Sequence, residues 1–111
     1  MFKRPARILF VADASIAHAV RRAAAIHDER IEARTTIGVD AADLAWADLV
    51  VTLDQTDVAR LPPLPAHCRH RPWPLTATER SSNAAIETAI GERIRAMRGG
   101  LRLLDRLDAQ D

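Results

Sequence analysis

Short apolar runs alternate with helical patterns along the chain. The runs Ile8–Val11 and Asp48–Leu53 have the length and composition of buried strands in a parallel sheet. We expect Ile31–Thr36 and Arg69–Trp73 to form strands as well, and Pro72 would confine the second of these to an edge of the sheet. Four strands that alternate with helices predict an α/β fold. It would be a doubly wound four-stranded parallel sheet with helices on both faces.

Two helical segments are expected in the first half of the chain. Ser15 is an N-cap residue type, and an alanine-rich pattern with helical spacing follows it through Ile26. Asp40 is expected to cap a short helix that runs through Trp46. The stretch Asp54–Arg60 predicts one or two helical turns, and the prolines that follow it break regular structure.

The longest helix is predicted at the end of the chain. Thr76 and Glu79 form a capping-box pattern, and Ser82 offers a second starting point. Apolar residues then recur at steps of three and four and form one stripe: Ile86, Ile90, Ile94, Met97, Leu101 and Leu104. The pair Gly99-Gly100 weakens the helix and predicts a bend or frayed end there.

Composition and charge describe an ordinary globular protein. The 111 residues are 48% hydrophobic and 28% charged, which is typical of a single folded domain over residues 1–111. A net charge of +1 gives no basis for a nucleic-acid or membrane partner. Cys68 is the single cysteine, which excludes an internal disulfide and suits a reducing compartment. Since no signal peptide or membrane-spanning run is evident, we expect a cytoplasmic location.

The segment Arg7–Val20 combines a strand, a loop of small residues and the start of a helix. This arrangement aims backbone N–H groups at an anion. Here the chain resembles the low-molecular-weight protein tyrosine phosphatase family, whose first strand runs into a loop written V-C-x5-R-S. Val11 matches the family's valine. Ala12 stands where the cysteine would be, His18 where the arginine would be and Ala19 where the serine would be.

Two later segments extend the resemblance over most of the chain. The stretch Trp46–Asp54 is similar to the family segment in which an Ala-Asp pair introduces a strand that ends in an acidic residue. Trp73–Thr78 stands where the family, and the related arsenate reductases, carry a Trp-x-apolar-Pro-Asp-Pro motif. Ala77 then replaces the aspartate that acts as the family's general acid. The short bacterial branch of predicted tyrosine phosphatases has about this length.

The resemblance implies a phosphatase fold without the phosphatase reaction. In the family the cysteine thiolate attacks phosphorus, the arginine holds the phosphate oxygens and the aspartate protonates the leaving group. Ala12, His18 and Ala77 cannot perform these three roles. We therefore expect a non-catalytic binding or regulatory module without a cofactor or metal. Its partner would be a protein or a small anionic ligand, and the chain would be a monomer or a weak homodimer. The expected ligand-binding residues are Asp13, Ala14, Ser15, Ile16, Ala17, His18 and Trp73.

Two alternative functions stay open. One is a hydrolase or phosphatase without a cysteine, in which Asp13 is a nucleophile or metal ligand, or Ser15 and His18 form a nucleophile–base pair. We favour simpler roles: Asp13 repels phosphate, Ser15 is an N-cap and His18 is solvated, since no third residue orients the histidine. The other alternative is a sugar-phosphotransferase IIB domain, which begins with a similar strand, loop and helix. Those domains also use a loop cysteine, which this chain lacks.

Other residues with chemical potential have simpler interpretations. His67, Cys68 and His70 suggest a metal site, but a strand would place only Cys68 and His70 on one face, which is too few for zinc. We therefore expect a solvated basic edge. Trp46 is expected to pack against the fold, whereas Trp73 either packs or lies beside the cleft.

Overall fold

The computed structural model describes residues 5–25, 31–54 and 58–109, with side chains described through residue 97. Four parallel strands form one sheet in the order β2-β1-β3-β4, so the predicted four-stranded parallel sheet is confirmed. The strands are β1 (Ala6–Val11), β2 (Ile31–Thr36), β3 (Leu49–Thr52) and β4 (Arg69–Pro72). The helices are α1 (Ala17–Ala24), α2 (Ala41–Trp46) and α4 (Asn83–Ala109).

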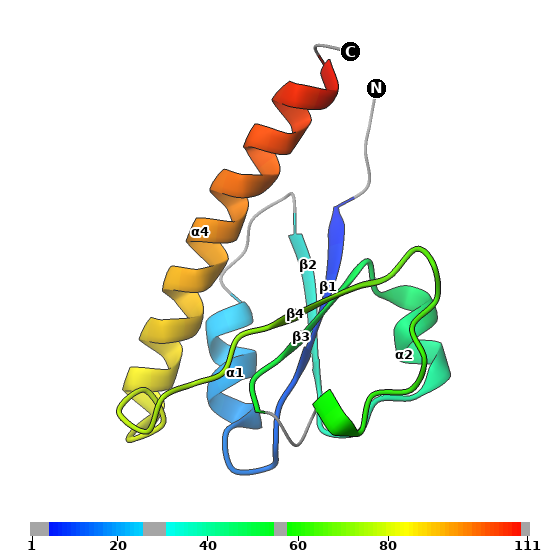
Figure 1. The fold of residues 1–111 in the computed structure, drawn as a ribbon. Helices are drawn as coiled ribbons and strands as arrows, with labels where there is room; N and C mark the ends of the chain where they lie inside the picture. Colours follow the sequence, from blue (N-terminus) through cyan, green and yellow to red (C-terminus); the bar gives the residue numbers. More distant parts are fainter. Residues whose placement is uncertain (1–4, 26–30, 55–57, 110–111) are drawn as a thin grey trace.

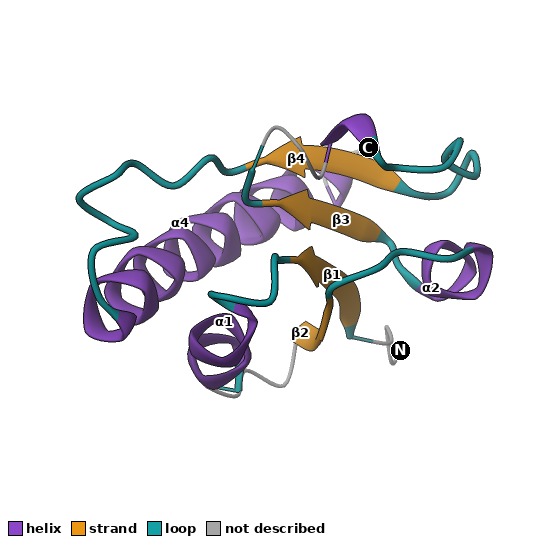
Figure 2. Ribbon diagram, turned by 90° about the horizontal axis from the view of Figure 1, so that it is seen from below, coloured by secondary structure: helices purple, strands orange, loops and turns teal. Residues whose placement is uncertain are grey.

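Helices lie on both faces of the sheet, as the sequence predicts. Figure 2 shows α1 and α4 on one side of the strands and α2 on the other. The long helix α4 runs along the side of the domain and extends beyond the sheet (Figure 1). Within the described residues, no helix combines the length and apolarity that crossing a membrane would require.

The core consists of two apolar layers, one on each face of the sheet. Along β1, Ile8 and Phe10 pack toward α1 and α4, whereas Leu9 and Val11 pack toward α2. Burial of both faces explains why this strand is a continuous apolar run rather than an alternating one. The stripe of α4 completes the first layer: its buried members are Ile86 and Ile90, and its partly buried members are Ile94 and Met97.

Local signals set several boundaries where the sequence predicts them. Strand β2 has the predicted bounds, and β4 is an edge strand that ends at Pro72. The carboxylate of Asp40 accepts a hydrogen bond from the N–H of Asp43 at 2.8 Å, and the carboxylate of Asp43 accepts one from the N–H of Asp40 at 3.1 Å. This reciprocal capping box starts α2.

Two predicted helix starts are corrected by the structure. Helix α1 begins after Ile16 rather than Ser15, and no side chain caps it, because the Ser15 hydroxyl donates to Asp13 instead. Thr76 and Glu79 do exchange hydrogen bonds, but these close a turn and not a helix. Helix α4 follows Ser82, whose Oγ accepts a hydrogen bond from a backbone N–H one turn ahead.

Four other expectations concern segments at or near the limits of the described residues. Helix α4 continues through the Gly99-Gly100 pair, where a bend or frayed end was predicted. The side chains of Leu101 and Leu104 lie outside the described residues. So do residues 55–57 of the predicted helical turn over Asp54–Arg60, and Ile26 of the first predicted helix.

Candidate functional site

The carboxyl ends of the strands meet at one edge of the sheet, at the bottom of Figure 1. The loop from Ala12 to Ile16 follows β1, Leu53 and Asp54 follow β3, and the segment from Trp73 to Ser82 follows β4. Ligands of doubly wound sheets bind in the crevice outside this edge. The resemblance-based site therefore lies where the fold favours binding.

Backbone N–H groups of the loop after β1 are bonded within the protein. Ala12 N–H donates to the carbonyl of Thr36 at 3.0 Å, and the N–H groups of Ile16 and Ala17 donate to the carbonyl of Asp13 at 3.2 and 3.0 Å. The N–H of Ser15 donates to the Asp13 carboxylate at 3.0 Å. An anion-binding loop directs such groups at its ligand. Here these four N–H groups already donate to acceptors within the protein.

The Asp13 carboxylate is the acceptor around which this loop is organised. Its Oδ1 accepts hydrogen bonds from both the backbone N–H and the hydroxyl of Ser15, and its Oδ2 lies 2.7 Å from Nη2 of Arg80. Partial burial alone would raise the pKa of Asp13. The hydrogen bonds from Ser15 and Arg80 and the charge of Arg80 outweigh burial, so the pKa lies below its ordinary value. Asp13 is therefore ionised at neutral pH.

Arg80 is the residue of this site that sequence reasoning missed. Its guanidinium bridges two carboxylates, with Nη2 at 2.7 Å from Asp13 and Nη1 at 3.5 Å from Asp54. The turn before it is fixed by hydrogen bonds between Thr76 and Glu79, and Arg80 N–H closes that turn on the carbonyl of Thr76 at 3.0 Å. One sequence signal could have indicated Arg80. It lies in the segment after β4, and this segment and the loop after β1 meet at the same edge of the sheet.

The structure does not bring Ser15 and His18 together as a nucleophile and base. Both described hydrogen bonds of Ser15 go to Asp13, and His18 is exposed on α1. Among the other loop residues, Ala14 is exposed, whereas Ile16 and Ala17 are buried in the core below the loop. The expectation that Ser15 is simply an N-cap is wrong; its hydroxyl holds the carboxylate of Asp13.

The two tryptophans pack against the fold. The Trp73 ring is half-buried, with its centroid 5.9 Å from that of Phe10 and the two ring planes tilted by 56°. Trp46 is also half-buried, and the Arg34 guanidinium lies 4.1 Å from its ring centroid. Ala77, which the resemblance places at the position of the general acid, is exposed in the turn that precedes α4.

The histidines and cysteine near β4 do not form a metal site in the part of the chain that the structure describes. Cys68 is buried, and that burial, with the nearby charge of Asp48, raises the pKa of its thiol. His70 Nε2 lies 2.7 Å from the hydroxyl of buried Thr52, and His67 is exposed. Cys68 and His70 are thus used in packing and hydrogen bonding.

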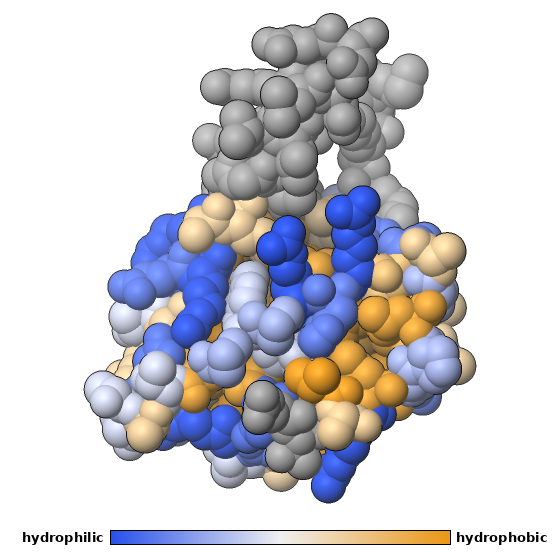
Figure 3. Space-filling view, in the orientation of Figure 1, coloured by the Kyte–Doolittle hydropathy of each residue, from blue (hydrophilic) through white to orange (hydrophobic). Residues whose placement is uncertain are grey.

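Strand β4 presents a basic edge. Arg69 and Arg71 are exposed on it, and the sequence carries no acidic residue from position 58 through position 78. In the orientation of Figure 1, where β4 lies in front, Figure 3 shows hydrophilic side chains across the middle and hydrophobic ones toward the lower right. The expectation of a solvated basic edge is consistent with this exposure.

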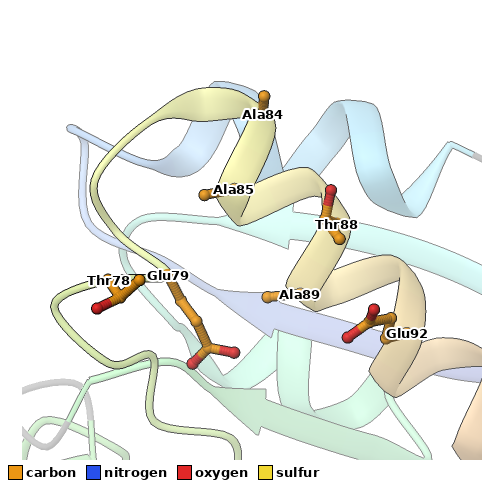
Figure 4. A pocket seen from close by; sticks show the side chains of 7 residues that line it. All are labelled: Thr78, Glu79, Ala84, Ala85, Thr88, Ala89 and Glu92. Atoms are coloured by element: carbon orange, nitrogen blue, oxygen red, sulfur yellow. The ribbon is translucent and has the colours of Figure 1, made fainter.

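A shallow depression of about 350 Å³ lies between α4 and the turn that precedes it (Figure 4). Thr78 and Glu79 line it from the turn, and the helix side is lined by Ala84, Ala85, Thr88, Ala89 and Glu92. The Glu79 carboxylate forms an ion pair with Arg93, and its Oε1 lies 3.1 Å from Nη2 of Arg93. The lining includes no residue of the loop after β1, so this depression is separate from the site that the sequence predicts.

Comparisons with known proteins add no family assignment. No protein-family model matches this chain, and no curated protein matches it at a significant level. The relation to low-molecular-weight phosphatases is therefore a proposal. It rests on the sequence resemblance over Arg7–Val20, Trp46–Asp54 and Trp73–Thr78.

Proposed function

We propose that this chain is a catalytically inactive relative of the low-molecular-weight protein tyrosine phosphatases, a pseudophosphatase that acts as a binding or regulatory module. One observation carries the proposal. The loop that would hold the substrate phosphate in that family is closed on the protein's own carboxylate, Asp13, which accepts hydrogen bonds from Ser15 and Arg80.

The chemistry of the loop supports an inactive protein. A phosphate dianion that entered would meet an ionised carboxylate and four N–H groups, those of Ala12, Ser15, Ile16 and Ala17, that already have acceptors. Ala12 provides no nucleophile, and it is fully buried, with 0% of its surface exposed. Arg80 supplies a positive charge at the edge, but Asp13 and Asp54 already neutralise it. Because anion capture is disfavoured at this loop, a protein partner suits the module better than a small anion.

A mechanism through Asp13 or Ser15 receives less support. Both carboxylate oxygens of Asp13 accept hydrogen bonds, which lowers their nucleophilicity. The Ser15 hydroxyl donates to this carboxylate, whose lowered pKa makes it a poor general base at neutral pH. The IIB alternative needs a loop cysteine, and Cys68 lies before β4, far from the loop in sequence and buried on the α2 side of the sheet.

A phosphatase assay tests the proposal. We expect the purified chain to hydrolyse p-nitrophenyl phosphate and phosphotyrosine peptides no faster than a buffer control. The matched variants are Cys68→Ala, which removes the only thiol, together with Asp13→Ala and Ser15→Ala. Turnover that survives Cys68→Ala and disappears in Asp13→Ala or Ser15→Ala would replace the inactive module with an enzyme that uses a substitute nucleophile.

A further inference from the structure

The two edges of the sheet differ in what they offer to another strand. On β4, Pro72 has no N–H group, and the N–H of Cys68, just before the strand, is bonded to the carbonyl of Pro65 at 3.0 Å. The N–H groups of Arg69 and Trp73 point inward, to β3. The outer side of β4 therefore keeps a single backbone donor, that of His70, which is a poor template for a further strand.

Strand β2, at the opposite edge, is open. In its parallel ladder with β1, the even-numbered residues of β2 make the hydrogen bonds, as the bond from Ala12 N–H to the Thr36 carbonyl shows. The N–H and C=O groups of Ile31, Ala33 and Thr35 therefore point away from the sheet. Among the described residues none of these groups has a partner, and the strand contains no proline.

A groove and an exposed apolar side chain accompany this edge. The groove has a volume of about 300 Å³ and lies between α1 and β2. Its lining combines three alanines and one isoleucine with two charged residues: Arg21, Ala24, Ala25, Ile31, Glu32 and Ala33. Ile37, directly after β2, has 54% of its surface exposed, more than any other large hydrophobic residue described. A strand added to β2 would present every second side chain on the face of the sheet where this groove lies.

The charges on β2 favour a second copy of the same strand as its partner. Glu32 and Arg34 point to the face of the sheet opposite α1, two positions apart, with Ala33 between them. If a second β2 pairs antiparallel with its Ala33 opposite Ala33, the outward groups of residues 31, 33 and 35 meet as hydrogen-bonded pairs. In that register Glu32 lies directly opposite Arg34 of the partner subunit, and symmetry repeats the pair.

We propose that two copies of this chain associate through β2 in this register and form one sheet that continues across both. The strand is self-complementary in backbone and in charge, and the small residue Ala33 lies at the centre of the pairing. Within one copy, Glu32 lies 4.0 Å from Nε of Arg7, and the Arg34 guanidinium lies 4.1 Å from the Trp46 ring centroid. A second β2 in this register adds opposite charges to these contacts, whereas a strand with like charges at the same positions would be repelled. The proposal concerns the β2 edge and is independent of the function proposed for the loop after β1.

Proline substitution at the centre of the edge tests the backbone pairing. Sedimentation equilibrium of the wild-type chain should show a concentration-dependent dimer. Ala33→Pro removes an outward N–H that the monomer does not use, and it should raise the dissociation constant by about tenfold or more. Arg69→Glu, on the β4 edge, is the control and should leave the dimer unchanged. A wild-type chain that stays monomeric up to about 1 mM, or a dimer that Arg69→Glu weakens and Ala33→Pro does not, overturns the proposal.

Charge exchange tests the register and does not depend on the proline variant folding. Glu32→Arg and Arg34→Glu each place like charges opposite one another, so each variant alone should be monomeric. Mixed together, the two single variants should form a heterodimer, and the double variant Glu32→Arg/Arg34→Glu should recover the homodimer, because opposite charges face each other again. Circular dichroism checks that all are folded. Failure of both recoveries in folded variants contradicts the register and the proposal.

Discussion

Arg80 and Asp13 are 67 positions apart in the chain, yet Nη2 of Arg80 lies 2.7 Å from Oδ2 of Asp13. The contact ties the turn before α4 to the loop after β1, and through Asp54 it reaches the end of β3 as well. A protein anion and a protein cation thus neutralise each other at the edge where a doubly wound sheet binds its ligands. The proposed lack of phosphatase activity rests on the absence of a cysteine from the loop, and this contact adds an internal anion that opposes phosphate.

The contact makes stability depend on pH in a defined direction. Because the folded pKa of Asp13 is lowered, its contribution is complete above the unfolded value of about 4 and is lost as the pH falls through the folded value. Urea unfolding from pH 6 to pH 2 should show wild type losing more stability on acidification than Asp13→Asn does. The difference should be no more than about 1 kcal/mol, since water screens this partly exposed pair.

Glu79 also makes the stability of both proteins depend on pH. Its pKa is also lowered, through hydrogen bonds from the Thr76 N–H and from Arg93, so both proteins will lose some stability in acid. Only the difference between the two profiles reports on Asp13. Profiles that run parallel over the whole range would show that Asp13 is not paired in solution as it is in the structure.

A second prediction concerns the docking of α4. Ile90 is fully buried between α4 and the sheet, and Ile90→Asp should lower the free energy of unfolding by about 3 kcal/mol or more, because an unpaired carboxylate loses its hydration there. Arg95 is exposed on the same helix, and Arg95→Asp should change that free energy by no more than about 0.5 kcal/mol. Equal, small effects in urea melts would show that α4 is not packed on the sheet.

The reactivity of the single thiol gives a third prediction. Cys68 is buried, and desolvation with the charge of Asp48 raises the pKa of its thiol. In the native protein at pH 8 an aromatic disulfide reagent should therefore label Cys68 slowly, whereas in concentrated urea labelling should be complete and fast. Rapid labelling of the native protein would indicate an accessible thiolate and would reopen a redox or catalytic role for this residue.

Restoring the missing nucleophile alone should not restore a phosphatase. In Ala12→Cys the new thiol would be buried beside the Asp13 carboxylate, which raises the pKa of the thiol and opposes phosphate binding. Ala12→Cys with His18→Arg and Ala77→Asp is the smallest set from which we expect turnover of aryl phosphates. Adding Asp13→Asn should increase that turnover. Brisk activity of Ala12→Cys by itself would show that the positions matched to the arginine and the acid are wrong.

Much of the fold follows from local sequence signals. The apolar run of β1, the N-cap at Asp40 and the stripe of α4 through Met97 depend on neighbours in the sequence, and each appears where it is predicted. The candidate site depends more on contacts that local sequence patterns do not reveal. Ser15 has the residue type of an N-cap, but Asp13, two positions earlier, competes for its hydroxyl. The partner of Asp13 is a long side chain from a distant turn, and no local pattern reveals Arg80.

Asp13 serves as the internal anion of the loop in the proposed function, and an NMR titration with inorganic phosphate tests this role directly. At pH 7 the amide signals of residues 12–18 in wild type should hardly move. In Asp13→Asn they should shift, because the internal anion is gone and Arg80 keeps only its longer contact with Asp54. Tight binding by wild type, with shifts centred on residues 12–18 and no dependence on Asp13, would contradict the account and identify a working phosphate loop.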